Sequence, residues 1–282
     1  MRAYERLLNY VNIDTTADEN NPNCPSSGNQ WILAKQLVEE LKSLGIDNAH
    51  VDENCYVYAK IPAKGNSCPH KIGFISHMDT SPACAGGPVK TSIIHSYDGG
   101  DITLKNGLVI EATEYDFLQR LIGDDLIVTD GETLLGADNK AGVSIIMTLA
   151  EELMKNDAPD HCEVLIGFTP DEEIGRGADL FRIDHFGADF AYTVDGGELG
   201  EIEYENFNAA SANVKIKGLS IHPGSAKLKM KNAIRISAKF DALLPEFERP
   251  EYTEGYEGFF HLMEIKGTEE VCSLSYIIRD HS

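Results

Sequence analysis

The stretch KIGFISHMDT (residues 71–80) joins a short apolar run to two side chains with coordination chemistry. The run KIGFIS has the length and composition of a buried inner strand. His77 and Asp79 follow it directly. In open α/β sheets, functional sites gather outside the carboxyl ends of strands. The stretch therefore predicts one strand of an α/β sheet with a candidate site at its end.

The elements on either side of this stretch alternate between helix and strand. Residues 31–44 predict an amphipathic helix, with Leu33, Leu37, Leu41 and Leu44 at helical spacing and Gly45 as its stop. Further helices are predicted at 5–11 and 139–154, and strands at 56–61, 71–76, 163–169 and 190–194. Residues 99–126 contain hairpin-like pieces and stay unassigned. The alternation indicates an open α/β sheet.

The pattern changes near residue 206. Residues 211–217 alternate as a strand with one exposed face, placing Val214 and Ile216 on the same side. A helix is predicted at 232–244, and strands at 259–266 and 272–279. This β-α-β-β order predicts a small α+β layer separate from the first sheet.

The composition is globular but strongly acidic. Asp and Glu number 46 against 24 Lys and Arg, for a formal net charge of −22. A field of this sign repels phosphate backbones and anionic lipids, so we expect neither nucleic acid nor a membrane as a partner. The charge indicates either a solvated acidic surface or, in part, a site for cations.

Sorting signals and cysteine patterns are not evident. Charges interrupt the first fifteen residues, and nowhere do eighteen apolar residues run together, so we expect a cytoplasmic protein. The six cysteines form no C-x-x-C pair, and we expect free thiols in a reducing compartment.

Four clusters with acidic or histidine side chains lie at predicted strand ends or helix starts. His77 could bind a metal while Asp79 holds its other ring nitrogen, or it could be a structural histidine. Asp138, in LGADNKAG (135–142), could cap the following helix or bridge two cations. Each reading is open for these residues taken singly.

The remaining two clusters are purely acidic. Asp171, Glu172 and Glu173 follow a predicted strand, and three consecutive acids indicate either a solvated turn or a cation site where one glutamate binds metal and the other moves a proton. Asp195 precedes two glycines at another strand end, as a plain turn or as a ligand. The recurrence of all four clusters at element ends favours a shared site.

Taken together, these motifs resemble a known enzyme family. HMDTSP, TLLGADNKAG, FTPDEEIG and AYTVDGG are similar to motifs of the peptidase T branch, the tripeptide aminopeptidases, of the M20 metallopeptidases. The similarity continues through ENFNAAS, HPG, TEGYEGFFHL and YIIRD. It covers essentially the whole chain. The resemblance implies catalytic, metal-binding and substrate-binding roles for eight residues: catalytic Asp79 and Glu172; metal ligands His77, Asp138, Glu173 and Asp195; and substrate-binding His222 and Arg279.

The resemblance also implies how these roles are divided between two zinc ions. His77 and Asp195 would bind one zinc, Glu173 would bind the other, and Asp138 would bridge both. Glu172 would be the general base for the attacking water. Asp79 would orient the histidine, and a lid histidine, His222, would help to stabilise the tetrahedral intermediate.

The implied fold is an open mixed sheet flanked by helices, of the zinc exopeptidase type, with a smaller α+β lid domain inserted. Residues 1–206 would be the N-terminal part of the catalytic domain, and 207–282 a partial lid through which homodimers form. Ala83 and Asn139 stand where the family usually has acids. The family's glycine-rich loop and last histidine ligand are not found, so we expect a C-terminally truncated chain that is inactive by itself.

Two other functions stay open at this point. The first is another M20 activity, such as a dipeptidase, carboxypeptidase or amide deacylase, although TEGYEG (253–258) and YIIRD (276–280) favour the tripeptide aminopeptidases. The second is an inactive metal-binding fragment. The leading expectation is a zinc-dependent enzyme for short peptides with a free N-terminus.

Overall fold

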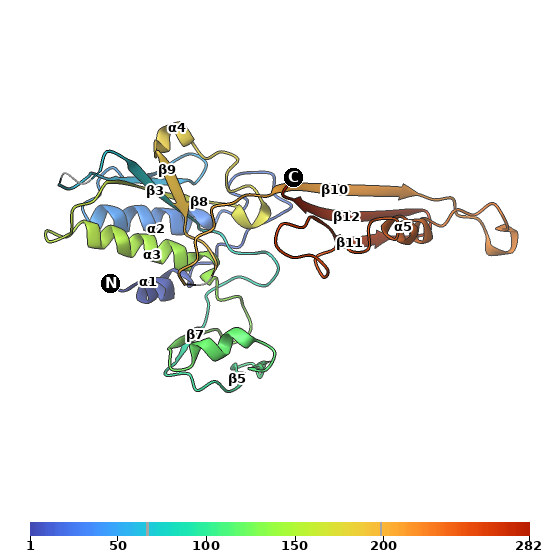
Figure 1. Cartoon of the computed structure of the whole chain (residues 1–282), viewed down its shortest axis with the longest axis horizontal. Helices are drawn as coiled ribbons and strands as arrows, with labels where there is room; N and C mark the ends of the chain where they lie inside the picture. Colours follow the sequence, from blue (N-terminus) through green and yellow to red (C-terminus); the bar gives the residue numbers. More distant parts are fainter. Residues whose placement is uncertain (66–67, 198) are drawn as a thin grey trace. The chain divides into compact units, whose positions relative to one another are not determined.

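The computed structural model describes residues 1–65, 68–197 and 199–282 (Figure 1). They divide into two compact units, Met1–Glu198 and Leu199–Ser282. The first unit carries the four clusters described above, and the second carries His222 and Arg279. Each unit is described below by itself.

A five-stranded mixed sheet organises the first unit. Its strand order is β1-β2-β8-β3-β9. The strands are β1 (His50–Val51), β2 (Val57–Ile61), β8 (Glu163–Thr169), β3 (Lys71–His77) and β9 (Phe190–Thr193). Strand β2 is antiparallel to β8, whereas β3 is parallel to both β8 and β9. The predicted open mixed sheet is confirmed.

Three helices lie on one side of this sheet: α1 (Ala3–Tyr10), α2 (Gln30–Ser43) and α3 (Ala137–Leu153). Helices α2 and α3 pack on the strands, and α1 packs against α3. All three helices predicted from periodicity are therefore confirmed, with ends within about two residues, which is the usual uncertainty of helix boundaries.

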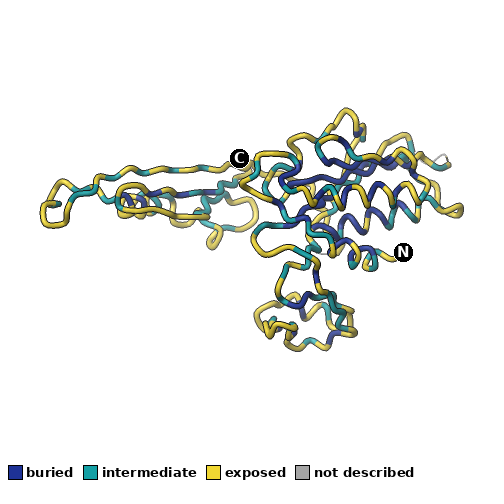
Figure 2. Tube along the Cα trace, turned by 180° about the vertical axis from the view of Figure 1, so that it is seen from behind, coloured by how far each residue is buried: buried dark blue, intermediate teal, exposed yellow. Residues whose placement is uncertain are grey.

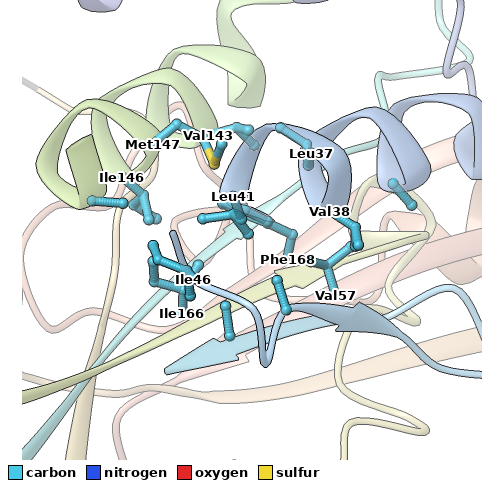
Figure 3. Packing of buried hydrophobic residues seen from close by; sticks show 14 of the residues in the cluster. Leu37, Val38, Leu41, Ile46, Val57, Val143, Ile146, Met147, Ile166 and Phe168 are labelled. Carbon is cyan, nitrogen blue, oxygen red and sulfur yellow. The ribbon is translucent and has the colours of Figure 1, made fainter. Parts of the chain in front are cut away.

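The main core fills the space between these helices and the sheet (Figure 3). Leu37 and Leu41 of α2, Val143 and Ile146 of α3 and Phe168 of β8 lie together in this core. All five are fully or almost fully buried. Truncating one such side chain to alanine typically costs about 2–5 kcal/mol, so this layer holds α3, and with it Asp138, at a fixed height above the strand ends.

The opposite face of the sheet carries a smaller aromatic cluster. Tyr56, Tyr58, Leu165 and Phe186 are buried there, with Phe181 packed against them. Phe186 belongs to α4 (Ile183–Phe186), which lies on the other side of the sheet from α2 and α3 (Figure 1). The strand residues that alternate with this cluster face the main core.

Residues 89–130 form an excursion from the first unit. It contains two antiparallel pairs, β4 with β7 and β5 with β6, and one 3-10 helix. Their bounds are β4 (Ser92–Ile94), β5 (Ile102–Thr103), β6 (Val109–Ile110), η1 (Asp116–Leu121) and β7 (Leu126–Val128). Tyr97, Ile102 and Leu118 form a small core of its own. The hairpin-like pieces seen at 99–126 correspond to the β5–β6 pair, whereas β4 lies outside that range.

The second unit is a three-stranded antiparallel sheet with one helix. The strand order is β10-β12-β11. The elements are β10 (Asn208–Lys217), η3 (Pro223–Ser225), α5 (Ala233–Asp241), β11 (Phe259–Gly267) and β12 (Val271–Asp280). Ala233 of α5 and Leu274 of β12 are fully buried between the helix and the sheet. Most other residues of this unit are exposed, whereas buried residues concentrate in the sheet and helices of the first unit (Figure 2). The predicted β-α-β-β layer is confirmed.

Two expectations about the chain as a whole can be compared with the structure. The prediction of six free thiols is wrong for two of them, because Cys68 and Cys162 form a disulfide between the start of β3 and the start of β8. The two cysteines are 94 residues apart, so no local spacing pattern in the sequence indicates that they pair. Over the part of the chain that the structure describes, no helix combines the length and apolarity needed to span a bilayer.

Candidate active site

Three strand ends and one helix start meet at one edge of the main sheet. Parallel pairing sets His77, the last residue of β3, opposite Thr169, the last residue of β8. Strand β9 runs parallel on the other side of β3 and is followed by Asp195. Asp138 reaches the same place from the first turn of α3. The fold therefore brings together clusters that lie up to about 120 residues apart in the chain.

His77 is 2% exposed and has a carboxylate at each ring nitrogen. Its Nδ1 lies 3.3 Å from Oδ1 of Asp79 and 3.1 Å from the Asp79 backbone oxygen. Its Nε2 lies 3.0 Å from Oδ1 of Asp138. The same Nε2 is 3.8 Å from Oε2 of Glu172 and 3.8 Å from Oδ2 of Asp195. Three carboxylates thus converge on a single imidazole nitrogen.

The acidic surroundings change the protonation of the site. Burial lowers the pKa of His77, but the hydrogen bond and charge of Asp79 and the charges of Asp195 and Glu172 raise it to about 9. Burial raises the pKa of Glu172 and Glu173, and other carboxylates add to this while His77 opposes it. Carboxylates at this spacing attract a positive charge, which a bound cation would supply.

Asp79 connects the histidine to the two glutamates. The side chain of Asp79 is completely buried. Its Oδ1 accepts a hydrogen bond from the Glu172 backbone N–H (3.0 Å), and its Oδ2 accepts one from the Glu173 N–H (3.1 Å). One carboxylate thereby fixes both the ring of His77 and the backbone of η2 (Glu172–Ile174). Asp79 is placed to position its neighbours rather than to meet a substrate.

Asp171, which the sequence presented only as one of three consecutive acids, has a structural role that was not predicted. It is completely buried, and its carboxylate accepts hydrogen bonds from the Ser26 N–H (2.7 Å), the Ser26 hydroxyl (2.5 Å) and Nε2 of Gln30 (2.7 Å). The backbone N–H of Asp171 donates to Oε1 of Gln30 (3.3 Å). Asp171 therefore fastens the loop before the two glutamates to the start of α2. No local pattern marked this role, because Ser26 lies in the irregular segment before α2 and meets Asp171 only on folding.

The reading of Asp138 as a helix cap does not describe its position. The Asn139 side chain takes that role, since its Oδ1 accepts from the Gly142 N–H at 3.2 Å. The amide nitrogen of Asn139 donates to the Val194 carbonyl (2.9 Å), one residue before Asp195. A side chain at Gly142 would overlap that carbonyl oxygen. The backbone of α3 therefore packs directly on the end of β9, and Asp138, 66% exposed, is left facing His77.

A hollow of about 380 Å³ adjoins the convergent side chains. His77, Glu172 and Asp195 line one wall, and Ile75, Ala178, Phe181 and Ile183 are among the apolar residues that line the rest. A Cβ at Gly177 would lie 3.1 Å from the Cα of Glu172, so glycine there allows the wall to approach the glutamate. The hollow offers polar groups at one end and an apolar surface for a side chain.

His222 and Arg279 lie in the second unit and are described within it. His222 is exposed at the start of η3, where its Nδ1 accepts from the Gly224 N–H at 3.2 Å. Arg279 is near the end of β12, with its guanidinium 5.5 Å from the ring of Phe207 and bonded to the Ile278 carbonyl. Their roles toward a substrate stay predictions.

The donor set fits a divalent metal ion. Among the described residues, His77, Asp138 and Asp195 form the one group whose ligand atoms all lie within 4.8 Å of one another. Imidazole nitrogen and carboxylate oxygen both bind zinc, and three protein ligands leave the open position of a catalytic site. The carboxylate of Asp79 against Nδ1 is the usual outer partner that directs Nε2 to the metal. Glu173 lies outside this group.

Proteins with a curated description align with nearly the whole chain. Peptidase T of Caldanaerobacter subterraneus subsp. tengcongensis is 53% identical over 281 residues, covering 99% of this chain and 69% of that protein. Peptidase T of Alkaliphilus oremlandii is 50% identical, covering 98% of this chain and 69% of that protein. The chain belongs to the peptidase T family. It spans 69% of the length of these two family members.

Family profiles match parts of the chain, and solved structures share its fold. A profile of the peptidase dimerisation domain matches residues 204–282, and one of M42 glutamyl aminopeptidase matches residues 126–236. The structure is similar to aminopeptidase PepT of Bacillus cereus, with a TM-score of 0.70 and 23% identity, covering 100% of this chain and 66% of that one. A tripeptidase of Staphylococcus aureus is similar with a TM-score of 0.68 and 21% identity, covering 100% of this chain and 66% of that one. These likenesses confirm the predicted fold.

Proposed function

We propose that this chain carries the metal centre and part of the lid of a zinc-dependent aminopeptidase, which releases the N-terminal residue of tripeptides by attack of activated water. The observation that carries the proposal is the convergence of Asp138, Asp195 and Glu172 on Nε2 of His77, within 3.0 to 3.8 Å. The peptidase T name of the family members supports the choice of a short peptide as the substrate.

The metal ligands follow from the donor set. His77, Asp138 and Asp195 would hold one ion, and Asp138 with Glu173 would contribute to a second, so that the complete enzyme uses two. Bound zinc would supply Lewis-acid chemistry, lowering the pKa of water and polarising the scissile carbonyl. Burial of His77 and its bond to Asp79 keep the imidazole in the orientation that this binding needs.

Glu172 is suited to move the proton. Burial raises the pKa of its carboxyl group above the ordinary value, and the side chain lines the hollow beside the metal ligands. A base with a raised pKa can both accept a proton from water and return one to the leaving amine. The Asp79 carboxylate, through the Glu172 N–H, holds this base at a fixed position relative to His77.

The remaining parts of the proposal concern substrate and assembly. A free α-ammonium group complements the carboxylates of the site, and the apolar wall of the hollow would take the first side chain. His222 would assist oxyanion stabilisation and Arg279 would bind substrate, both as the family resemblance implies. We assign residues 1–206 to the catalytic domain and 207–282 to a lid that forms homodimers, in a protein of the cytoplasm.

The test uses two proteins, this chain and a chimera that adds the part of the Caldanaerobacter relative outside the matched region. Each is assayed with matched tripeptides that have free or acetylated N-termini, before and after metal chelation. The chimera should cleave the tripeptide with a free N-terminus and not the acetylated one. It should lose this activity on chelation and regain it with zinc. Equal cleavage of the acetylated peptide would identify another M20 activity, and activity that survives complete metal removal would rule out the metal mechanism.

A further inference from the structure

A second pair of coordinating side chains lies on the far face of the main sheet. His50 is in β1 and His185 is in α4, and both side chains are exposed. Their Nε2 atoms are 3.2 Å apart. Neither residue belongs to the site described above. The pair joins two elements separated by 135 positions in the chain.

The surroundings of the pair fix its rings. Nδ1 of His50 lies 3.0 Å from the Asn48 carbonyl oxygen, which can only accept, so Nδ1 carries the proton and Nε2 presents a lone pair. The ring of Tyr58 contacts both imidazoles, with centroids 5.8 Å from His50 and 5.2 Å from His185. This is the arrangement of a metal-binding histidine, in which a backbone carbonyl holds one nitrogen and directs the other outward.

We propose that His50 and His185 form a separate site for a divalent transition metal, zinc or copper(II), bound through both Nε2 atoms. With a zinc–nitrogen bond of about 2.05 Å, nitrogens 3.2 Å apart subtend an angle of about 103° at the metal, close to the tetrahedral value. Imidazole nitrogens suit both ions. Water would complete the coordination, because the pair is open to solvent.

The neighbouring charges permit a cation at this place. The pair opens on a hollow of about 380 Å³ that Asp184 also lines. Lys60 and Lys71 line the same hollow, but their ammonium groups lie 3.0 and 3.9 Å from the carboxylate of Glu163, which together with Asp184 balances their charge. A bound metal would cross-link the edge strand β1 to α4. It would act as a staple on the face opposite α2 and α3.

The experiment compares metal binding by the chain and its variants. Chain stripped of metal is titrated with zinc by calorimetry as wild type, His50→Gln, His185→Gln and the matched control His95→Gln, which changes an exposed histidine paired with Asp125. The same set is repeated in a His77→Gln background, which removes the imidazole of the other site. Circular dichroism verifies folding, and copper(II) electron paramagnetic resonance counts the coordinated nitrogens.

The expected result is the loss of one equivalent of bound zinc in either single variant, in both backgrounds, with none lost in His95→Gln. Copper(II) in the His77→Gln background should show two imidazole nitrogens, falling to one when His185 is replaced. The alternative is a simple N–H···N hydrogen bond between the rings. Equal zinc stoichiometry and affinity in all forms, or a copper spectrum unchanged by the substitutions, would overturn the proposal.

Discussion

Three consecutive acids, Asp171, Glu172 and Glu173, have different roles because their side chains lie in different environments. Asp171 is completely buried and holds the chain to α2. Glu172 lines the hollow 3.8 Å from His77, and Glu173 lies on the same short turn but outside the group of close ligand atoms. The same chemical group therefore serves as an anchor, a candidate base and a candidate ligand within one turn of chain.

The division between the two glutamates can be tested in the chimera. Glu172→Gln should leave the metal content unchanged and lower kcat by about 10²–10⁴, the usual contribution of a general base. Glu173→Gln should instead reduce the metal content, because an amide is a poorer ligand for zinc than a carboxylate. Metal analysis and steady-state kinetics on both variants check this. If both variants lose metal equally, the assigned roles are wrong.

The anchor role of Asp171 predicts a specific rescue. In Asp171→Asn, the new amide NH₂ would face the Gln30 NH₂, leaving a buried donor unpaired at a cost of about 1–3 kcal/mol in the free energy of unfolding. Adding Gln30→Glu restores an acceptor and should recover most of that loss. Urea unfolding of the single and double variants measures it. A double variant less stable than Asp171→Asn would contradict the hydrogen-bond pattern.

The sequence indicated the site residues that follow strand ends, because strand prediction and side-chain chemistry are both local. His77 and Asp195 were nameable for that reason, and Asp138 was nameable because it lies at a predicted helix start. The roles of Asp171 and Asn139 could not be predicted, because each depends on a partner far away in the sequence. Asp171 binds Gln30, and Asn139 binds the Val194 carbonyl. A buried polar side chain is defined by its partners, and the partners appear only on folding.

At the scale of the elements, one buried arginine of helix α1 forms ion pairs with both α2 and α3. Arg6 of α1 is 2% exposed, and its guanidinium lies 2.7 Å from Glu40 of α2 and 2.5 Å from Glu151 of α3. Arg6→Met should lower the free energy of unfolding by about 3 kcal/mol, at the lower end for a broken buried pair because both glutamates keep some solvent contact. Arg2→Met, at an exposed site, is the control and should change it by less than about 0.5 kcal/mol.

The same cluster predicts an acid dependence of stability. Hydrogen bonds from the N-terminal ammonium group and from Arg6 lower the pKa of Glu151 to about 2 from an ordinary 4.5. The unfolded chain therefore binds this proton first as the pH falls. The stabilisation is complete above pH 4.5 and is lost as the pH drops toward 2. Unfolding curves between pH 6 and pH 3 should show a smaller loss for Glu151→Gln than for the wild type.

Helices and strands that span several periods of the hydrophobic pattern were predicted well, and the shortest elements were not. The heptad-like leucines of α2 and the alternation in β10 span several periods, so their patterns rise above chance. Strands β1 and β4 and helix α4 have two to four residues, which is too short for a repeating pattern of side chains to be recognised. They are held by pairing with a neighbouring strand or by packing in an aromatic cluster. Local pattern carries little information about such pieces.

At the scale of the whole molecule, the described ligands favour unequal metal binding. The first site has His77, Asp138 and Asp195, whereas the second has Asp138 and Glu173 among the described residues, and carboxylates alone suit zinc poorly. Dialysed chain should retain about one tightly bound zinc. The measurement uses His185→Gln, so that the separate site proposed above does not add to the count. Two tightly held ions would contradict this account.

Strand β9 is the end strand of the five-stranded sheet, with β3 as its one partner in the order described. An end strand opens more readily than an inner one, so its amides should exchange hydrogen with solvent faster than those of β8. Asp195 follows β9 directly, and a metal held between Asp195 and His77 would oppose that opening. Zinc should therefore slow exchange at residues 190–194 far more than at 163–169. Occupancy of the centre would then be readable from the hydrogen exchange of one strand, without any assay of peptide cleavage.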